Sequence, residues 1–308
     1  MAKEFKTYDE LVSLLQSRNV ETDELTKTQI MRESYYAIVN GYKDPFLDKD
    51  AMQKSSDDIY LKGTKFEWLY SLFSFDRDLR SLTFKYLTQA ESIMKNAIVY
   101  AFCEKHNNPY DYLERSNYTD AKNILVPQGY SGNKFKLFQD NLATLMRILN
   151  SKISGRSSKS FIQHYLDTYG FVPLWVLQND LTFGHIAHFY QLQTRSIQNR
   201  ACKIIAEAIG RPGTKNLTPM KLLHAFSVLV EYRNICAHDE RLYCARVGKS
   251  HDIDFYQMAL SLILVLPTEE FNNFLDGIFD LFAKYDGTLH VVTSTSLLKN
   301  MGFKVEEN

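Results

Sequence analysis

The stretch from Phe66 to Cys103 places the strongest constraint on the fold. Its apolar residues recur at steps of three and four, the spacing that gathers them on one side of an α-helix. They are Leu79, Leu82, Tyr86, Ala90, Ile93, Ala97 and Ala101. The stretch predicts two long helices or one bent helix. No stretch shows sustained period-two alternation, the pattern of a half-buried strand, so we expect an all-α protein, a bundle of roughly ten helices.

Composition allows such a fold and limits how the chain can bind a polyanion. The 308 residues are 45% hydrophobic, enough for one large core or two smaller ones. Lys and Arg number 36, and so do Asp and Glu, so no net positive charge attracts nucleic acid. Any nucleic-acid binding must come from a local basic patch.

The cysteines and the apolar runs indicate a cytoplasmic protein without a membrane segment. No CxxC pair occurs among the cysteines, which are Cys103, Cys202, Cys236 and Cys244. We expect free thiols in a reducing compartment. The amino terminus lacks a basic-then-apolar signal segment. The longest apolar run, Leu260 to Pro267, is too short to cross a bilayer.

A second helix is predicted to begin at residue 218 and to end in a polar cluster. Thr218 is suited to cap it and Pro219 to occupy its first position. The apolar residues Leu222, Leu223, Phe226, Leu229 and Val230 follow at helical spacing. The same face then carries Arg233 and Asn234. Because burying such groups without partners is costly, they either pair internally or line a cleft.

The spacing of these polar residues permits a site without proving one. Asn234 and His238 are four residues apart and share a helix face. Arg233 lies about 140° around an ideal helix from His238 and reaches the same point through its long side chain or if the helix ends there. Spacing alone favours a buried ion pair between Arg233 and Glu231 beside a surface histidine.

The wider context of these residues resembles a known family. Arg233-Asn234-x3-His238, followed by Arg241-Leu242, resembles the R-N-x3-H form of the Rx4-6H motif in HEPN-domain ribonucleases. More narrowly, it is similar to bacterial abortive-infection proteins of the Abi-D/Abi-F type. Two other blocks carry the same resemblance in the same order: the tyrosine-rich segment 35–46 and the segment 161–184, with its Pro-Leu-Trp-Val. Related proteins usually carry a glutamate soon after that tryptophan, where this chain has Gln178, Asn179 and Asp180.

The resemblance implies a HEPN-like helical bundle with endoribonuclease activity. It implies an anti-phage toxin that arrests growth, with RNA as substrate and an RNA or protein antitoxin as a partner. Arg233, Asn234 and His238 are then the catalytic residues. HEPN ribonucleases pair two motifs across a dimer, so a homodimer is implied as well.

The chemistry of RNA cleavage is compatible with these side chains and needs no metal or cofactor. The 2′-hydroxyl is the nucleophile, so cleavage requires a base, an acid for the leaving 5′-oxygen and a cation for the developing charge. His238 serves as base or acid, because histidine exchanges protons near neutral pH. Arg233 holds the phosphate in a bidentate fork, and Asn234 orients either partner.

Four further residues are candidates for supporting the site. HEPN proteins commonly carry a polar residue on the helix facing the motif, and Glu91 or Asn96 fits that role. The competing interpretation is a solvated helix flank on which Glu91 pairs with Lys95. Asp239 and Arg241 follow the histidine. Asp239 is also suited to hold the imidazole in a buried ion pair, which would make the motif structural.

Two segments carry a local surplus of basic residues. Residues 115–159 contain eight basic residues and two acids, and residues 195–249 contain ten and four. Such runs either track a phosphate backbone or form solvated surface. The candidate RNA contacts are Lys134, Lys136, Lys203, Arg211 and Lys215. His185 and His188 are spaced for a metal, but no third ligand accompanies them in a recognisable pattern.

We expect a single Abi/HEPN-like domain over residues 1–308, with a helical N-terminal part to about 63, a HEPN-like core over about 64–285 and a loose tail from about 286. The main alternative function is a non-catalytic RNA- or protein-binding module in defence or toxin-antitoxin regulation. A small-molecule or nucleotide enzyme is a further alternative, for which no motif is present.

Overall fold

The computed structural model describes residues 4–53, 57–127, 130–154, 159–213 and 215–305. Its α-helices are α1 (Tyr8–Ser17), α2 (Thr26–Glu33), α3 (Lys49–Met52), α4 (Phe66–Lys105), α5 (Lys134–Ile153), α6 (Ser160–Tyr169), α7 (Leu174–Leu177), α8 (Phe183–Gln191), α9 (Arg195–Ala208), α10 (Pro219–Ala237), α11 (Phe255–Leu262), α12 (Thr268–Tyr285) and α13 (Ser294–Asn300). Shorter helical turns are η1 (Tyr36–Asn40), η2 (Asp44–Phe46), η3 (Asp111–Leu113), η4 (Arg115–Asn117) and η5 (Gln178–Asp180). The all-α prediction is confirmed.

Strand structure is minimal. β1 (Val20–Glu21) and β2 (Thr64–Lys65) form a parallel pair in which Val20 is opposite Thr64. Among the described residues this is the only sheet. None of the described helices combines the length and the hydropathy that a membrane crossing requires.

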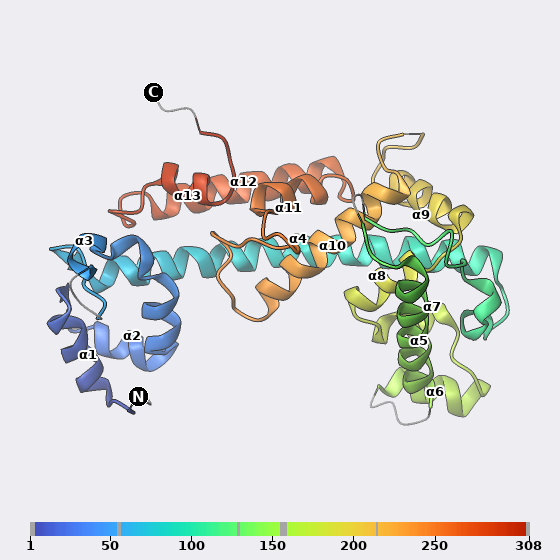
Figure 1. The fold of residues 1–308 in the computed structure, drawn as a ribbon, viewed down its shortest axis with the longest axis horizontal. Helices are drawn as coiled ribbons and strands as arrows, with labels where there is room; N and C mark the ends of the chain where they lie inside the picture. Colours follow the sequence, from blue (N-terminus) through green and yellow to red (C-terminus); the bar gives the residue numbers. More distant parts are fainter. Residues whose placement is uncertain (1–3, 54–56, 128–129, 155–158, 214, 306–308) are drawn as a thin grey trace. The chain divides into compact units, whose positions relative to one another are not determined.

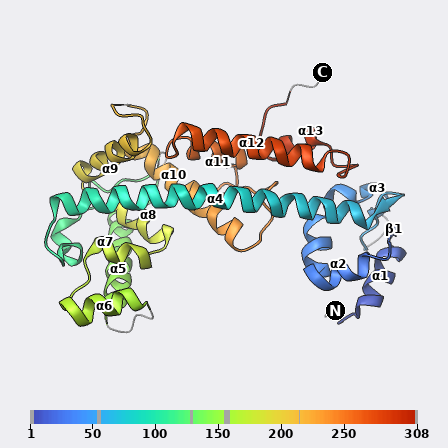
Figure 2. The same cartoon turned by 180° about the vertical axis from the view of Figure 1, so that it is seen from behind.

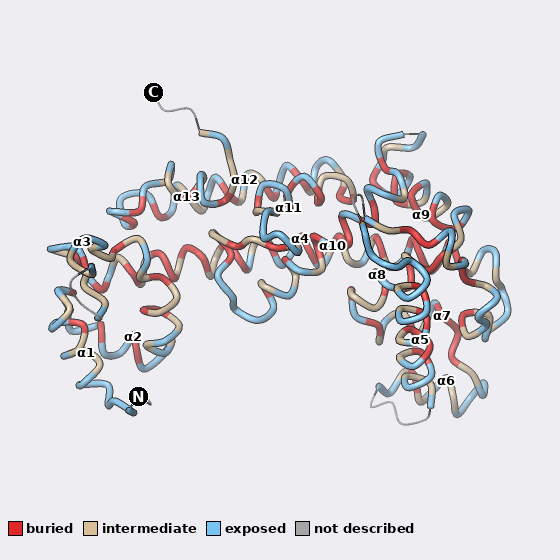
Figure 3. Tube along the Cα trace, in the orientation of Figure 1, coloured by how far each residue is buried: buried red, intermediate tan, exposed pale blue. Residues whose placement is uncertain are grey.

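The long periodic stretch forms one continuous helix, α4, of 40 residues. Neither glycine nor proline occurs within it, so nothing forces the break that would divide it into two. Buried positions recur along α4 (Figure 3), including Leu79, Tyr86, Ala90 and Ala97. The helix therefore supplies apolar surface along its whole length.

The chain packs as two compact units. Unit 1 comprises Met1–Thr83, His238–Ala245 and Leu275–Asn308, and unit 2 comprises Phe84–Ala237 and Arg246–Phe274. This division differs from the segments expected from the sequence, because both α4 and α12 contribute to each unit. The single domain expected from the sequence stays a prediction.

In unit 1 the carboxyl-terminal part of α12 packs against the first half of α4 (Figures 1 and 2). The ring of Phe75 lies 5.3 Å from that of Phe282 and 5.7 Å from that of Tyr285. A Cβ added at Gly277 would lie 2.8 Å from Leu82 Cδ1. Glycine therefore permits the close approach of the two helices.

The C-terminal segment is more ordered than the sequence indicated. Residues 286–305 include α13, which Thr293 caps by accepting a hydrogen bond from Ser296 N at 3.1 Å. Leu297 and Met301, one turn apart, are fully buried. The expectation of a loose tail from residue 286 is wrong, because these apolar side chains anchor it. Residues 306–308 lie outside the described residues.

Unit 2 is built around the second half of α4 together with α5, α8, α9, α10 and α11. Its core includes Phe226 of α10, whose ring lies 5.4 Å from that of Phe183 and 5.5 Å from that of Tyr190, both in α8. Figure 1 shows α8 and α9 beside the first half of α10. This packing fixes the helix that ends at the Arg-Asn-x3-His motif.

Candidate functional site

Helix α10 forms as the sequence predicts. Thr218 Oγ1 accepts a hydrogen bond from Lys221 N at 3.3 Å, and Pro219 is the first helical residue. Leu222, Phe226 and Leu229 are buried. The predicted cap and apolar face are both confirmed, and they set the rotation of the helix up to its last turn.

The helix ends inside the motif. α10 stops at Ala237, and Asp239 has a φ of 56°. Aspartate is one of the few residues that tolerate this left-handed conformation, which commonly terminates helices. His238 therefore lies in an exposed turn just beyond α10. It begins the part of the chain that belongs to unit 1, whereas Arg233 and Asn234 belong to unit 2.

Arg233 pairs with a carboxylate of α4. Its Nε lies 3.3 Å from Glu91 Oε2, and the side chains are only 19% and 16% exposed. The geometry of this contact is not that of a hydrogen bond, and Arg233 Nε has no hydrogen-bond acceptor. The pair with Glu231 allowed by the sequence is replaced by this one, and Glu231 instead accepts a hydrogen bond from Gly248 N.

Glu91 is shared between two cations. Lys95 Nζ lies 2.9 Å from Glu91 Oε1 and donates a hydrogen bond to Leu181 O at 2.6 Å. The expected Glu91–Lys95 pair is confirmed, and it sits against the motif rather than on a solvated flank. The other α4 candidate, Asn96, is exposed, as is Asn234 of the motif itself.

Asp239 does not clamp the histidine. Its side chain is 87% exposed, and its Oδ1 lies 3.6 Å from Arg80 Nε. His238 is exposed as well. The buried ion pair between Asp239 and His238 that the sequence allowed is therefore not formed.

Arg241 fastens the segment that follows the histidine. Its Nη1 donates to Gly41 O at 2.9 Å and to Asp44 Oδ2 at 3.1 Å. These contacts tie residues 238–245 to the loop after η1 within unit 1. The structure thus assigns Arg241 a positioning contact within unit 1.

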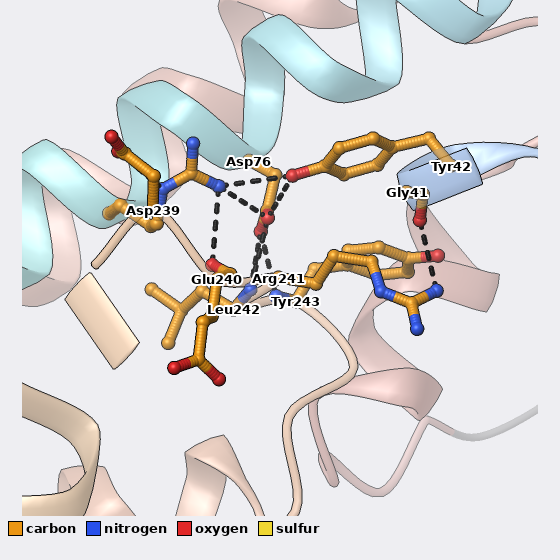
Figure 4. Close-up of polar contacts among 9 residues, drawn as sticks. Gly41, Tyr42, Asp76, Asp239, Glu240, Arg241, Leu242 and Tyr243 are labelled. Atoms are coloured by element: carbon orange, nitrogen blue, oxygen red, sulfur yellow. Dashed lines mark hydrogen bonds and ion pairs between the residues drawn. The ribbon is translucent and has the colours of Figure 1, made fainter. Parts of the chain in front are cut away.

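The sequence analysis missed a buried polar cluster that holds this same segment (Figure 4). Asp76 of α4 is fully buried and accepts hydrogen bonds from Leu242 N at 3.0 Å and Tyr243 N at 2.7 Å. The hydroxyl of Tyr42 also donates to Asp76, at 2.7 Å. Two backbone amides just past the motif are therefore fixed by one carboxylate.

Arg80 completes the cluster. Its Nη1 donates to Asp76 Oδ2 at 2.9 Å, to Tyr42 Oη at 3.0 Å and to Glu240 O at 3.4 Å. A usable signal was present in the sequence: Asp76 and Arg80 stand one turn apart on the apolar stripe of α4, where an unpaired charge would be costly.

Burial dominates the titration of this cluster. Burial raises the pKa of Asp76, although the hydrogen bonds from Leu242 and Tyr42 and the charge of Arg80 oppose the rise. Burial, then the neighbouring Asp76 charge, raises the pKa of Tyr42 far above its usual range. Tyr42 consequently stays protonated and remains a donor at any physiological pH.

The candidate RNA-contacting residues lie at different places in unit 2. Lys134 and Lys136 are exposed in the first turn of α5, and Lys134 lines a pocket of about 690 Å³ with Lys122 and Arg195. A second pocket, of about 500 Å³, is lined by residues that include Lys203 and Lys215. The structure does not gather these lysines into one patch.

Two other candidates make structural contacts. Arg211 donates from Nη1 to Ile263 O at 2.9 Å and from Nη2 to Leu266 O at 3.0 Å, so it holds the turn after α11. His185 forms a capping box with Thr182 at the start of α8. Burial lowers the pKa of His185 and of His188. No metal-binding group of three or more ligands is found in the part of the chain that the structure describes.

Comparison with known proteins gives one match. A model of the family described as Abi-like protein matches residues 28–244, more than half of the chain. The match extends from α2 to the Asp76-bound segment and includes all three blocks of the sequence resemblance. No curated protein and no solved structure matches. The chain therefore belongs to the Abi-like protein family, and the abortive-infection type that its sequence indicated is confirmed.

Proposed function

We propose that this protein is a metal-independent endoribonuclease of the HEPN type that acts in abortive infection, with Arg233, Asn234 and His238 as catalytic residues. The observation that carries the proposal is the state of Arg233. Its side chain is only 19% exposed, and its Nε has no hydrogen-bond acceptor. It stands five residues before an exposed histidine.

Arg233 is suited to bind the scissile phosphate. A guanidinium presents a fork of donors that matches phosphate oxygens. Glu91 neutralises it and restrains its direction through the 3.3 Å contact. A phosphate oxygen that accepts from the guanidinium would gain charge as the transition state forms, so the interaction strengthens during the reaction.

His238 is suited to the proton transfers. It lies in an open turn rather than inside the core, so RNA can reach its imidazole. Asn234 is exposed one turn earlier and can orient either the 2′-hydroxyl or the imidazole. The attack of the 2′-oxygen on phosphorus leaves a 2′,3′-cyclic phosphate on one product and a 5′-hydroxyl on the other.

One imidazole is a poor base and acid in the same turnover. A homodimer whose two-fold axis brings two motifs together supplies both roles. The proposal therefore includes RNA and a second copy of the chain as partners, with an RNA or protein antitoxin as the restraint expected of a toxin.

The test compares the wild type with His238→Ala in bacteria and in purified form. Wild-type expression should arrest growth and fragment RNA, and purified protein should cleave single-stranded RNA in excess chelator. His224→Ala is the matched control, because His224 is an exposed histidine of α10, the helix that leads to His238. Strict dependence on a divalent metal, 5′-phosphate products, or equal activity of wild type and His238→Ala would refute the mechanism.

A non-catalytic binding module is the second candidate. It is favoured by the ion network of Arg233, Glu91 and Lys95, because such a network can serve structure alone. In that case RNA stays intact in every assay, and Arg233→Ala lowers the melting temperature sharply.

A further inference from the structure

Unit 1 holds a pocket that the proposed chemistry does not use. Its volume is about 510 Å³, and all of its lining residues belong to unit 1. η1, the first part of α4 and residues 239–241 contribute its walls. It therefore adjoins the segment that starts with His238. Its size would accommodate a nucleobase with its sugar.

One wall carries a buried donor without an acceptor. Arg80 is 4% exposed, and its Nη1 makes the three hydrogen bonds that hold the Asp76 cluster. Its Nε has no hydrogen bond, and its ion-pair partner Asp239 is 3.6 Å away. That distance is too long for a hydrogen bond. An unsatisfied buried donor is costly. Nε is shielded from solvent, so a shift of the Arg80 or Asp239 side chain that let a ligand acceptor reach it would stabilise the pocket.

The mouth of the pocket offers flat surfaces. Tyr36 is a pocket residue with 75% of its surface exposed. Inside, the guanidinium of Arg77 lies over the ring of Phe73, 5.3 Å from its centre. Aromatic rings and guanidinium planes are the surfaces on which unstacked bases lie. Tyr36 begins η1, a π-helical turn, and such turns occur frequently at functional sites.

The charges argue for a neutral ring rather than for a phosphate. Arg77 Nη1 is paired with Glu33 at 2.8 Å. Arg241 Nη1 is paired with Asp44 at 3.1 Å. Carboxylates of Asp239 and Glu240 also line the pocket. A free anion would meet as many carboxylates as arginines, whereas a ring with both donors and acceptors would find partners for each.

We propose that this pocket binds one unstacked nucleobase, with guanine preferred, and that the base belongs to the RNA that the chain cleaves. Guanine presents O6 and N7 as acceptors for Arg80 Nε. Its N1–H and N2 amino group can donate to a carboxylate such as that of Asp239. The base would then be held one residue from His238, which gives cleavage a preference for sites near guanine. That the base comes from an RNA substrate rests on the proposed function. That the pocket recognises guanine does not.

The test measures binding in the full-length His238→Ala protein, so that no cleavage is needed. The four nucleoside 5′-monophosphates are titrated by calorimetry. Decauridylate is compared with the same RNA carrying one central guanosine, by fluorescence anisotropy. We expect GMP to bind more tightly than AMP, CMP or UMP, and the guanosine RNA to bind more tightly than decauridylate.

Tyr36→Ala, added to His238→Ala, should weaken GMP binding about tenfold, the effect of losing one base–aromatic stack. Tyr36→Phe should restore it. Tyr100→Ala is the control, because Tyr100 is 59% exposed on α4 and lies outside the pocket. Arg80 is left intact, since its other bonds hold Tyr42, Asp76 and Glu240.

Each outcome decides one element of the inference. Absence of GMP binding at millimolar concentration, or equal loss in Tyr36→Ala and Tyr100→Ala, overturns the pocket. Equal binding of all four nucleotides overturns the guanine preference. GMP binding without a gain for the guanosine RNA identifies a free nucleotide as the ligand and overturns the RNA source. A chain that binds guanine but never cleaves RNA refutes only the proposed nuclease activity.

Discussion

The two units each contain an arginine paired with a carboxylate of α4, and the two pairs are built differently. In unit 1, Arg80 and Asp76 are 4% and 0% exposed. In unit 2, Arg233 and Glu91 are 19% and 16% exposed. Asp76 is surrounded by donors from Tyr42, Leu242 and Tyr243 in addition to Arg80. Glu91 is contacted by the two cations Lys95 and Arg233, and the Nε of the arginine lacks a hydrogen-bond acceptor in both pairs.

The difference separates structure from chemistry. A carboxylate enclosed by donors has no capacity for a substrate, so the Asp76 cluster serves to position the segment after the motif. A guanidinium held by one carboxylate and partly open to solvent keeps donors for a phosphate. The comparison is consistent with the proposed role of Arg233 in binding phosphate and indicates that Asp76 acts through the fold.

Asp76→Ala should give the largest loss of stability. It leaves Arg80 buried without its counter-ion and leaves two backbone amides unpaired, and removing one partner of a buried pair costs about 3–5 kcal/mol. Urea unfolding measures this loss. Glu104→Ala is the control, because Glu104 lies on α4, as Asp76 does, and forms an exposed pair with Arg200 of α9. Exposed pairs contribute far less to stability than buried ones. Equal midpoints for the two variants would contradict the structural role of Asp76.

Arg233→Ala should instead lower activity far more than stability. Loss of one cation at the developing charge should slow RNA cleavage by about 10²–10³-fold, the size seen when one oxyanion donor is removed. Arg233→Lys should not restore the rate, because an ammonium cannot form the bidentate fork. Cleavage rate and melting temperature are measured on the same preparations. If Arg233→Ala unfolds, the pair of Arg233 and Glu91 has a structural role like that of Asp76.

The sequence predicted the elements better than their partners. The cap at Thr218 and the pair of Glu91 with Lys95 were predictable, because both depend on residues within one helical turn. The contact of Arg233 with Glu91 joins residues that are 142 positions apart. Spacing within one helix cannot select such a partner, and Glu231 was the nearest alternative in sequence.

The buried cluster was missed for the same reason. Asp76 and Arg80 are one helical turn apart, but the role of the pair depends on the amides of Leu242 and Tyr243, which are distant in sequence. The pocket by Tyr36 was likewise hidden, since a tyrosine-rich segment mostly packs inward. Ile38, Val39 and Tyr42 do pack inward, and only the fold shows that Tyr36 does not.

Glu91→Gln should give an intermediate effect on activity. The amide keeps the size of the side chain but removes the charge that restrains Arg233, so the guanidinium moves more freely. Misplacement of a catalytic group by about 1 Å can cost as much as 10²-fold in rate. We expect a loss smaller than that of Arg233→Ala, measured as initial cleavage rate. A wild-type rate would show that Glu91 does not position Arg233.

The smallest expected effect is on how stability depends on pH. It compares His185 of unit 2, which titrates, with Tyr42 of unit 1, which does not. Burial lowers the pKa of His185 in unit 2, where its Nδ1 accepts from Thr182 N at 3.3 Å. A lowered folded pKa stabilises the protein above the unfolded value of about 6.5, and this contribution disappears as pH falls through the folded pKa.

Melting temperatures should therefore decline between pH 8 and pH 5. His185→Asn keeps an acceptor that does not titrate and should flatten this decline. Tyr42→Phe, a change within the Asp76 cluster of unit 1, should lower stability at both pH values, because it removes a buried hydrogen bond whose donor does not titrate in this range. An unchanged pH slope in His185→Asn would assign the decline to other groups.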